Sequence, residues 1–316
     1  MSGHSFVLTP MDFCEEPVTE IAPKHKLAKA TKEQITQFKQ FIDKFGVFPG
    51  ISWAHYEHNY REVLGEKPGN ISYHPEALDQ EKWRYWVVCF DGNNSLLREL
   101  QWACALIPNH IELGFTFLYG DAFPKGSSGH MYDGSAIQSF VNDHLPPTKV
   151  KQLCQEDLKN IRQIFDQIKS LPQRYDHIRR ALTRFDNLRT LPRHSELNVI
   201  GLVSVIESLV SHAPKLTDSA DSLSHQLRTK IPLLWKRFTF PLNQSEFFTD
   251  IQEEKLWSKV YSYRSKIVHG EDAALTGDLQ LLKTQELVID FLREVTKRLL
   301  HLSLCEPRFM TDLKKC

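Results

Sequence analysis

From residue 150 to residue 305 the chain has helical periodicity and no strand signal, and this stretch constrains the fold more than any other feature. Apolar residues recur three or four positions apart in six segments. The pattern predicts helices over 150–169, 174–189, 195–212, 219–236, 252–269 and 279–304. Short connections between such segments favour antiparallel neighbours. The second half of the chain is therefore expected to be an all-α helical bundle.

The first half carries a mixed pattern. Thr31 and Gln34 form a capping box at the start of an amphipathic segment, which predicts a helix. Aromatic and β-branched residues over 83–90 and 111–119 predict two strands, and residues 95–107 between them have helical spacing. This order predicts a small α+β domain.

Proline and glycine mark the boundary between the two halves. Six of these residues fall between positions 121 and 149, which predicts a linker. The expected organisation begins with an irregular lead-in (1–30), an α+β accessory or sensor domain (31–120) and a linker (121–149). A helical domain (150–305) and a tail (306–316) follow.

Composition excludes several classes of protein. Of 316 residues, 41% are hydrophobic and 25% are charged, which excludes a disordered or collagen-like chain. The six cysteines include no CxxC pair, which argues against a cysteine-based zinc site and against a disulfide framework. No apolar run approaches the ~20 residues that a membrane span needs, and no signal peptide is recognisable. We therefore expect a cytoplasmic protein that needs no metal or cofactor and does not contact a membrane.

The charges are balanced over the whole chain but divided between its halves. There are 39 basic and 39 acidic residues in total, of which 26 basic and 21 acidic residues lie in 151–316. The first half therefore carries an excess of acidic residues. Either the two halves attract each other, or the second half binds an anionic partner.

One segment of the second half combines residues with chemical potential. In YSYRSKIVHG, residues 261–270, Arg264 and His269 flank an apolar stripe, and Gly270 is a natural helix terminator. A protonated His is favoured at the carboxyl end of a helix, yet it would repel the nearby Arg. An anion between the two side chains would resolve that conflict. The two side chains point ~140° apart around a helix, so a partner helix across a two-fold axis would complete such a site.

The arrangement Arg-x4-His-Gly near a helix end resembles the HEPN superfamily, and YRSKIVHG is similar to its ApeA-like branch. Two upstream segments, VIESLV (205–210) and SLSHQLRTKIPLLW (222–235), occur in the order seen in that branch. The resemblance covers roughly residues 150–305. It implies a homodimeric helical domain that is usually a metal-independent endoribonuclease in bacterial toxin–antitoxin or antiviral defence systems. Arg264 and His269 of both subunits would then be catalytic.

Other residues are assigned roles by the same resemblance. Glu207 lies on the apolar face of its predicted helix, where a carboxylate is costly unless paired, and upstream acidic residues of the family often contact the motif Arg. We therefore expect Glu207 to orient Arg264, although it could also extend to water. Arg180, Arg184 and Lys266 are candidates for RNA binding, whereas the arginines could equally form a solvated face.

The alternatives for function differ in class. Many family members have Asn, Asp or His after the motif Arg, where this chain has Ser265, and that difference favours a non-catalytic module for dimerisation and nucleotide or RNA binding. A third interpretation is a toxin that an antitoxin neutralises. A phage-derived trigger could act through the α+β domain. RNA and a second copy of the chain are the partners common to most of these readings.

Overall fold

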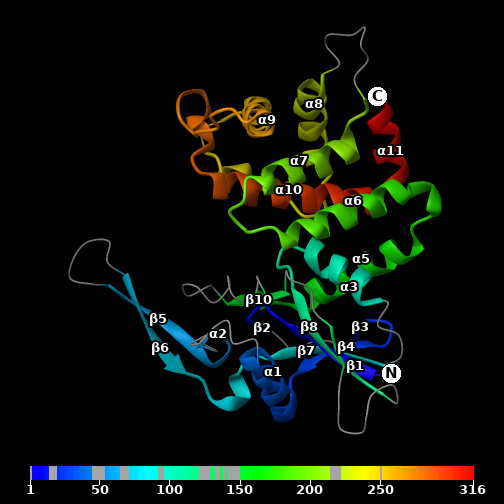
Figure 1. The fold of residues 1–316 in the computed structure, drawn as a ribbon. Helices are drawn as coiled ribbons and strands as arrows, with labels where there is room; N and C mark the ends of the chain where they lie inside the picture. The colour runs from blue at the N-terminus through cyan, green and yellow to red at the C-terminus, as the bar shows by residue number, and fades with distance from the viewer. Residues whose placement is uncertain are drawn as a thin grey trace. The chain divides into compact units, whose positions relative to one another are not determined.

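The computed structural model describes residues 2–13, 20–44, 54–64, 71–91, 96–120, 129–131, 136–137, 140, 150–213, 222–249 and 251–316 (Figure 1). A region built on a sheet is followed by a helical region. The chain divides into two compact units, Met1–Gln163 and Ile164–Cys316. This division falls inside helix α5 (Gln155–Ser170), whereas the linker was expected to end at residue 149.

The first unit is built on a six-stranded sheet. Its neighbouring strands pair antiparallel in the order β3-β4-β7-β1-β8-β9. These strands are β1 (Ser2–Val7), β3 (Glu20–Ala22), β4 (His25–Lys29), β7 (Trp86–Asp91), β8 (Leu113–Tyr119) and β9 (Gly129–Met131).

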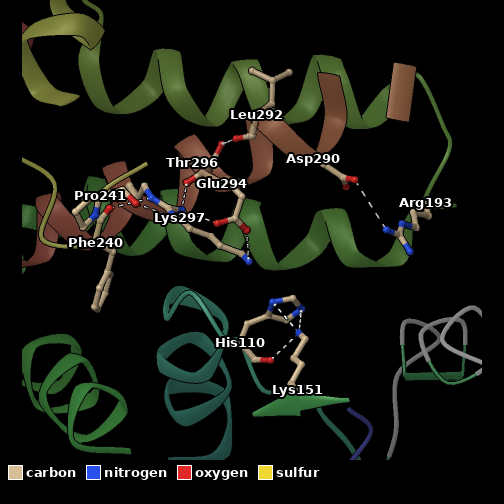
Figure 2. Close-up of polar contacts among 11 residues, drawn as sticks. His110, Lys151, Arg193, Phe240, Pro241, Asp290, Leu292, Glu294, Thr296 and Lys297 are labelled. Atoms are coloured by element: carbon tan, nitrogen blue, oxygen red, sulfur yellow. Dashed lines mark hydrogen bonds and ion pairs between the residues drawn. The ribbon is translucent and has the colours of Figure 1, made fainter. Parts of the chain in front are cut away.

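Two smaller sheets complete the strands of this unit. Strand β2 (Met11–Phe13) pairs in parallel with β10 (Lys151–Leu153), and β5 (His58–Leu64) pairs antiparallel with β6 (Ile71–Ala77). Lys151 Nζ donates a hydrogen bond of 3.1 Å to the carbonyl oxygen of His110 (Figure 2).

The expectation of an irregular lead-in over residues 1–30 is wrong. Strand β1 lies at the centre of the sheet, where Ser2 is opposite Asp91 on one side and Tyr119 on the other. Residues Gly3 to Val7 are all buried, so the segment lacks the alternation of polar and apolar residues that marks a half-exposed strand. Pro23 lies in the turn between β3 and β4 and therefore separates strands instead of preventing them.

An aromatic cluster fills the core of the first unit. Helix α1 (Lys32–Lys44) contributes Phe38, whose ring lies 4.2 Å from Phe6 and 5.5 Å from Phe115, between ring centroids. The capping box is confirmed, because Thr31 Oγ1 accepts from the Gln34 amide at 3.2 Å and Gln34 Oε1 accepts from the Thr31 amide at 2.8 Å. Short helices α2 (Ala54–Glu57), η1 (Gln80–Lys82) and α3 (Leu97–Leu106) complete the unit.

The described residues of the expected linker belong to this unit. β9 extends the sheet beside β8, and Phe140 is a buried member of the aromatic cluster. The linker prediction is therefore wrong for these residues, because glycine and proline here mark turns within a domain. The other residues of 121–149, Ala136 and Ile137 aside, lie outside the described part of the chain.

The second unit is helical, as expected. After α5 come α6 (Asp176–Asn187), α7 (Leu197–Val210), α8 (Leu223–Trp235), α9 (Glu253–His269), α10 (Gln285–Cys305) and α11 (Pro307–Lys315). Short 3-10 helices connect some of them, namely η3 (Gln173–Tyr175), η4 (Leu188–Thr190), η5 (Gln244–Glu246) and η6 (Gly277–Leu282). Helix α7 packs against α6, α8, α9, α10 and α11, so it is the central helix of this unit.

The expected tail over residues 306–316 is also corrected. Pro307 begins helix α11, and the buried Met310 anchors it. A proline at the first helical position has no amide hydrogen to satisfy, so it starts a helix as readily as it ends one. The residues 306–316 therefore extend the helical unit.

Helix α10 carries buried charge among its apolar residues. The carboxylate of Glu294 meets Lys297 Nζ at 2.8 Å (Figure 2). The same carboxylate meets Arg298 Nη1 at 2.5 Å. Burial opposes ionisation of Glu294, but the two cations outweigh it and lower the pKa of this carboxyl group. Arg298 Nε also donates to the carbonyl oxygen of Phe240 at 3.0 Å, which ties the segment after α8 to α10.

Within the part of the chain that the structure describes, no helix is both long and apolar enough to span a lipid bilayer.

Candidate functional site

Helix α9 carries the Arg-x4-His motif and ends where the sequence predicts. Gly270 adopts a left-handed conformation, with φ 67°, and follows His269 directly. The Gly270 amide donates to Ile267 O at 3.2 Å and the Glu271 amide to Lys266 O at 2.9 Å, which is the hydrogen-bond pattern of a Schellman motif. The end of the helix, and with it the position of His269, is therefore set by backbone geometry.

Packing of α7 against α9 brings Glu207 and Arg264 together, as the sequence predicts. Arg264 Nη2 lies 3.8 Å from Glu207 Oε2, and their side chains are 21% and 15% exposed. This distance is an ion pair but too long for a hydrogen bond. The carboxylate therefore attracts and orients the guanidinium while leaving its donors available.

Both members of this pair carry a buried polar atom without a hydrogen bond among the described residues. The atoms are Glu207 Oε1 and Arg264 Nε. A buried unsatisfied polar group costs about 1–3 kcal/mol. Burial raises the pKa of Glu207, and Arg264 partly opposes that effect. An anion that approached Arg264 would have few existing hydrogen bonds to displace.

His269 lies at the exposed end of α9, one residue before Gly270. Within the described residues, no hydrogen bond or ion pair joins it to Arg264 or Glu207. Because α9 is continuous from Glu253, Arg264 and His269 point ~140° apart around the helix axis. One chain therefore presents the two side chains on different sides of α9.

Two tyrosines near the motif were not singled out as site residues from the sequence. The guanidinium carbon of Arg264 lies 5.8 Å from the ring centroid of Tyr261, which is three residues earlier and so on the same side of the helix. Tyr263 is buried and donates to Gln285 Oε1 at 3.2 Å. The spacing of Tyr261 and Arg264 was a signal that could have predicted their contact.

The candidate RNA-binding residues lie on two helices. Arg180 and Arg184 are exposed on α6, whereas Lys266 on α9 donates to the carbonyl oxygen of Asp272 at 3.3 Å. Among the described residues, no hydrogen bond or ion pair joins Arg180 or Arg184 to Arg264 or His269. The structure thus brings Glu207 and Arg264 together and leaves the other predicted residues at separate positions on the same unit.

Comparison with family models, with curated proteins and with solved structures finds no match for this chain. In the part of the chain that the structure describes, no three His, Cys, Asp or Glu side chains are grouped so that they could hold a metal ion.

Proposed function

We propose that the helical unit is a metal-independent endoribonuclease of the HEPN type that acts as a homodimer. The observation that carries this proposal is the half-buried Arg264 of α9, whose Nη2 lies 3.8 Å from Oε2 of Glu207 on α7. The exposed His269 lies on the same helix as Arg264. The proposal places the protein in a defence or toxin–antitoxin setting, with the first unit sensing a trigger or restraining the nuclease.

The residue types suit cleavage of RNA by its own 2′-hydroxyl group. That reaction requires removal of a proton from the 2′-OH, delivery of a proton to the leaving 5′-oxygen, and stabilisation of a dianionic phosphorane. An imidazole transfers protons near neutral pH, which is the role of His269. The planar, always charged guanidinium of Arg264 binds phosphate oxygens. The products would be a 2′,3′-cyclic phosphate and a 5′-OH end.

A second subunit explains the geometry around α9. Arg264 and His269 point in different directions on one helix. Two copies of α9 related by a two-fold axis would bring Arg264 and His269 of both subunits toward a shared phosphate. In this proposal Glu207 is a positioning residue, because its carboxylate lies 3.8 Å from the guanidinium of Arg264 and acts through it.

The test is an RNA cleavage assay in EDTA with the wild-type chain, Arg264→Ala, His269→Ala and the control Lys255→Ala. Lys255 is exposed on the same helix, so its removal controls for the loss of a charge from α9. We expect Arg264→Ala and His269→Ala to lower the cleavage rate by about 10²–10⁴-fold, and Lys255→Ala to leave it unchanged. Light scattering and circular dichroism first establish that all four proteins fold and dimerise.

Three results would contradict the proposal. Equal cleavage by all four proteins would place the activity elsewhere or in a contaminant, and a monomeric wild type would remove the composite site. Binding of RNA without cleavage would favour the non-catalytic module, for which Ser265 after the motif Arg is the supporting residue.

A further inference from the structure

A histidine and two arginines follow one side of helix α6. His177, Arg180 and Arg184 are three and four residues apart, so they share a stripe of the helix. His177 is half-buried, while both arginines are exposed. The two guanidinium groups start from positions about 6 Å apart along the helix axis.

Helix α11 contributes a lysine, Lys314, whose charge acts on His177 of this stripe. Both α6 and α11 pack against α7, and Lys314 on α11 donates from Nζ to the carbonyl oxygen of Ser208 at 2.7 Å. Ser208 lies in the last turn of α7, where carbonyl groups lack partners within the helix. The ammonium group of Lys314 is thereby held in place instead of moving freely in solvent.

Among the described residues, Arg180, Arg184 and Lys314 lack the acidic partners that other basic residues of the unit have. Arg180 and Arg184 form no ion pair among the described residues. The carboxylates of α6 form ion pairs with other arginines. Asp176 Oδ1 lies 3.9 Å from Arg179 Nε, and Asp186 Oδ1 lies 3.0 Å from Arg189 Nη1.

The electrostatics of the cluster show that its members repel one another. Burial lowers the pKa of Lys314, and the charges of Arg180 and Arg184 lower it further. Burial also lowers the pKa of His177, and the charges of Lys314 and Arg180 lower it further. The charges of Arg180, Arg184 and Lys314, held together at a cost, are stabilised when an anion binds between them, and such an anion would also favour protonation of His177.

We propose that His177, Arg180, Arg184 and Lys314, the α6–α11 surface, bind the phosphate backbone of single-stranded RNA. Two arginine forks one helical turn apart match successive phosphates along a strand better than a point charge does. Two observations disfavour a membrane as the partner of this surface. No large apolar residue is exposed on α6, whose residues are all described. The ring centroid of the exposed Phe309 on α11 lies 4.5 Å from the guanidinium carbon of Arg237, so this ring already has a partner within the chain. The choice of RNA among polyanions rests on the proposed function.

The position of the surface agrees with that choice. Lys314 is anchored on Ser208, and the preceding residue of α7 is Glu207, which pairs with Arg264. The α6–α11 surface and the candidate catalytic site therefore both contact the last turns of α7, through Ser208 and Glu207.

The experiment measures binding of a fluorescein-labelled 20-nucleotide single-stranded RNA by anisotropy over a range of salt concentrations, using His269→Ala as the parent so that no cleavage occurs. In that parent we compare Arg180→Ala/Arg184→Ala with Arg308→Ala/Lys315→Ala. The control pair removes the same charge from α11, at residues that both pair with Asp312, at 3.9 and 3.6 Å. Circular dichroism establishes that every variant folds.

We expect the Arg180/Arg184 variant to bind roughly tenfold or more weakly at 0.15 M salt, with the slope of log K against log salt reduced by roughly 1.4. The control should change affinity less than about twofold. A variant with Arg180→Lys/Arg184→Lys should keep the salt slope but lose part of the affinity, because the charge remains and the fork is lost.

Equal effects of the two double variants would overturn the proposal, and so would absence of RNA binding or preferential binding to phosphatidylserine vesicles. This outcome is separable from that of the proposed function. RNA that binds through the α6–α11 surface but is never cleaved by the wild-type chain would contradict only the ribonuclease. Cleavage that depends on Arg264, with binding that ignores Arg180 and Arg184, would contradict only this surface.

Discussion

The two units build their cores around different central elements, although both contain clustered aromatic rings, those of the second unit around Phe291. The first unit packs aromatic rings, such as Phe6, Phe38 and Phe115, between α1 and the sheet. The second unit packs aliphatic side chains of α7, such as Leu202 and Ile206, against neighbouring helices. Aromatic rings held in specific mutual orientations tolerate little change in volume, whereas aliphatic ridges between helices adjust by small shifts. The difference teaches that, at these central elements, the aromatic packing of the sheet unit is expected to tolerate substitution less than the aliphatic packing around α7.

The largest expected effect is that of Phe38→Ala. Removing this ring should destabilise the first unit by about 4 kcal/mol. Leu202→Ala in α7 should cost about 3 kcal/mol and act on the second unit. Hydrogen exchange measured peptide by peptide checks this, with protection lost in β1 and β8 for the first variant and in α7 and α10 for the second. Loss of protection across both units in either variant would show that the two units unfold together. The stabilities of their cores could then not be compared separately.

Acid should weaken both units through one buried histidine in each. Burial lowers the pKa of His4 and of His301 from 6.5 to about 4. The unfolded chain therefore gains a proton near pH 6.5 that the folded chain gains only near pH 4. Stability is complete above pH 6.5 and falls by about 3 kcal/mol per histidine as the pH drops to 4.

Urea unfolding at several pH values measures this loss. His4→Leu should reduce the acid sensitivity of the first unit alone, and His301→Leu that of the second unit alone. If the dependence of the urea midpoint on pH is the same in both variants as in the wild type, other groups cause the acid sensitivity.

Two glycines offer a matched pair with a smaller effect. A Cβ atom at Gly3 in β1 would lie 2.5 Å from both the backbone oxygen of Phe117 and a ring atom of Phe90. At Gly201 in α7 the closest atom, at 2.3 Å, belongs to the flexible side chain of Leu188. We expect Gly3→Ala to cost about 2 kcal/mol. Gly201→Ala should cost less than about 1 kcal/mol, because Leu188 can move and alanine favours a helix. Thermal unfolding of the two variants gives the order, and the reverse order would refute the contrast between the cores.

The smallest effects are expected at two helix caps. Thr31 begins α1 in the first unit, and Thr284 Oγ1 accepts from the Leu287 amide at 3.2 Å at the start of α10 in the second. Replacing either threonine by alanine should cost about 1 kcal/mol. Because a helix cap acts locally, the two replacements should lower the free energy of unfolding by similar amounts, although the helices pack on different cores. A difference of more than about 1 kcal/mol in urea unfolding would show that the cores influence even their helix ends.

The residues that the sequence placed well depend on local contacts. The capping box at Thr31, the helix end at Gly270 and the existence of the six helices of the second half follow from interactions within a few residues. Two predicted starts are wrong: residues 151–153 of the expected helix 150–169 form strand β10, and the expected helix 279–304 begins at Gln285. The pairing of Glu207 with Arg264 was also predicted, because a carboxylate on an apolar helix face needs a partner.

The residues that the sequence misplaced depend on distant contacts. β1 has no periodic pattern of its own, and its partners lie at positions such as Asp91 and Tyr119. Lys314 is similar, because its role follows from the carbonyl oxygen of Ser208 and not from its own neighbours. Such positions cannot be recognised from one sequence, since what defines them is the surface onto which they fold.

The central place of β1 in the sheet has a consequence for the order of events during synthesis. Ser2–Val7 leaves the ribosome long before its partners in β7 and β8, which end at Asp91 and Tyr119. At about 5–20 residues per second, the first strand waits roughly 6–22 s for the second of them. Through that interval the nascent chain exposes an unpaired strand that contains Phe6 and Val7, and this segment is where a chaperone would be expected to bind.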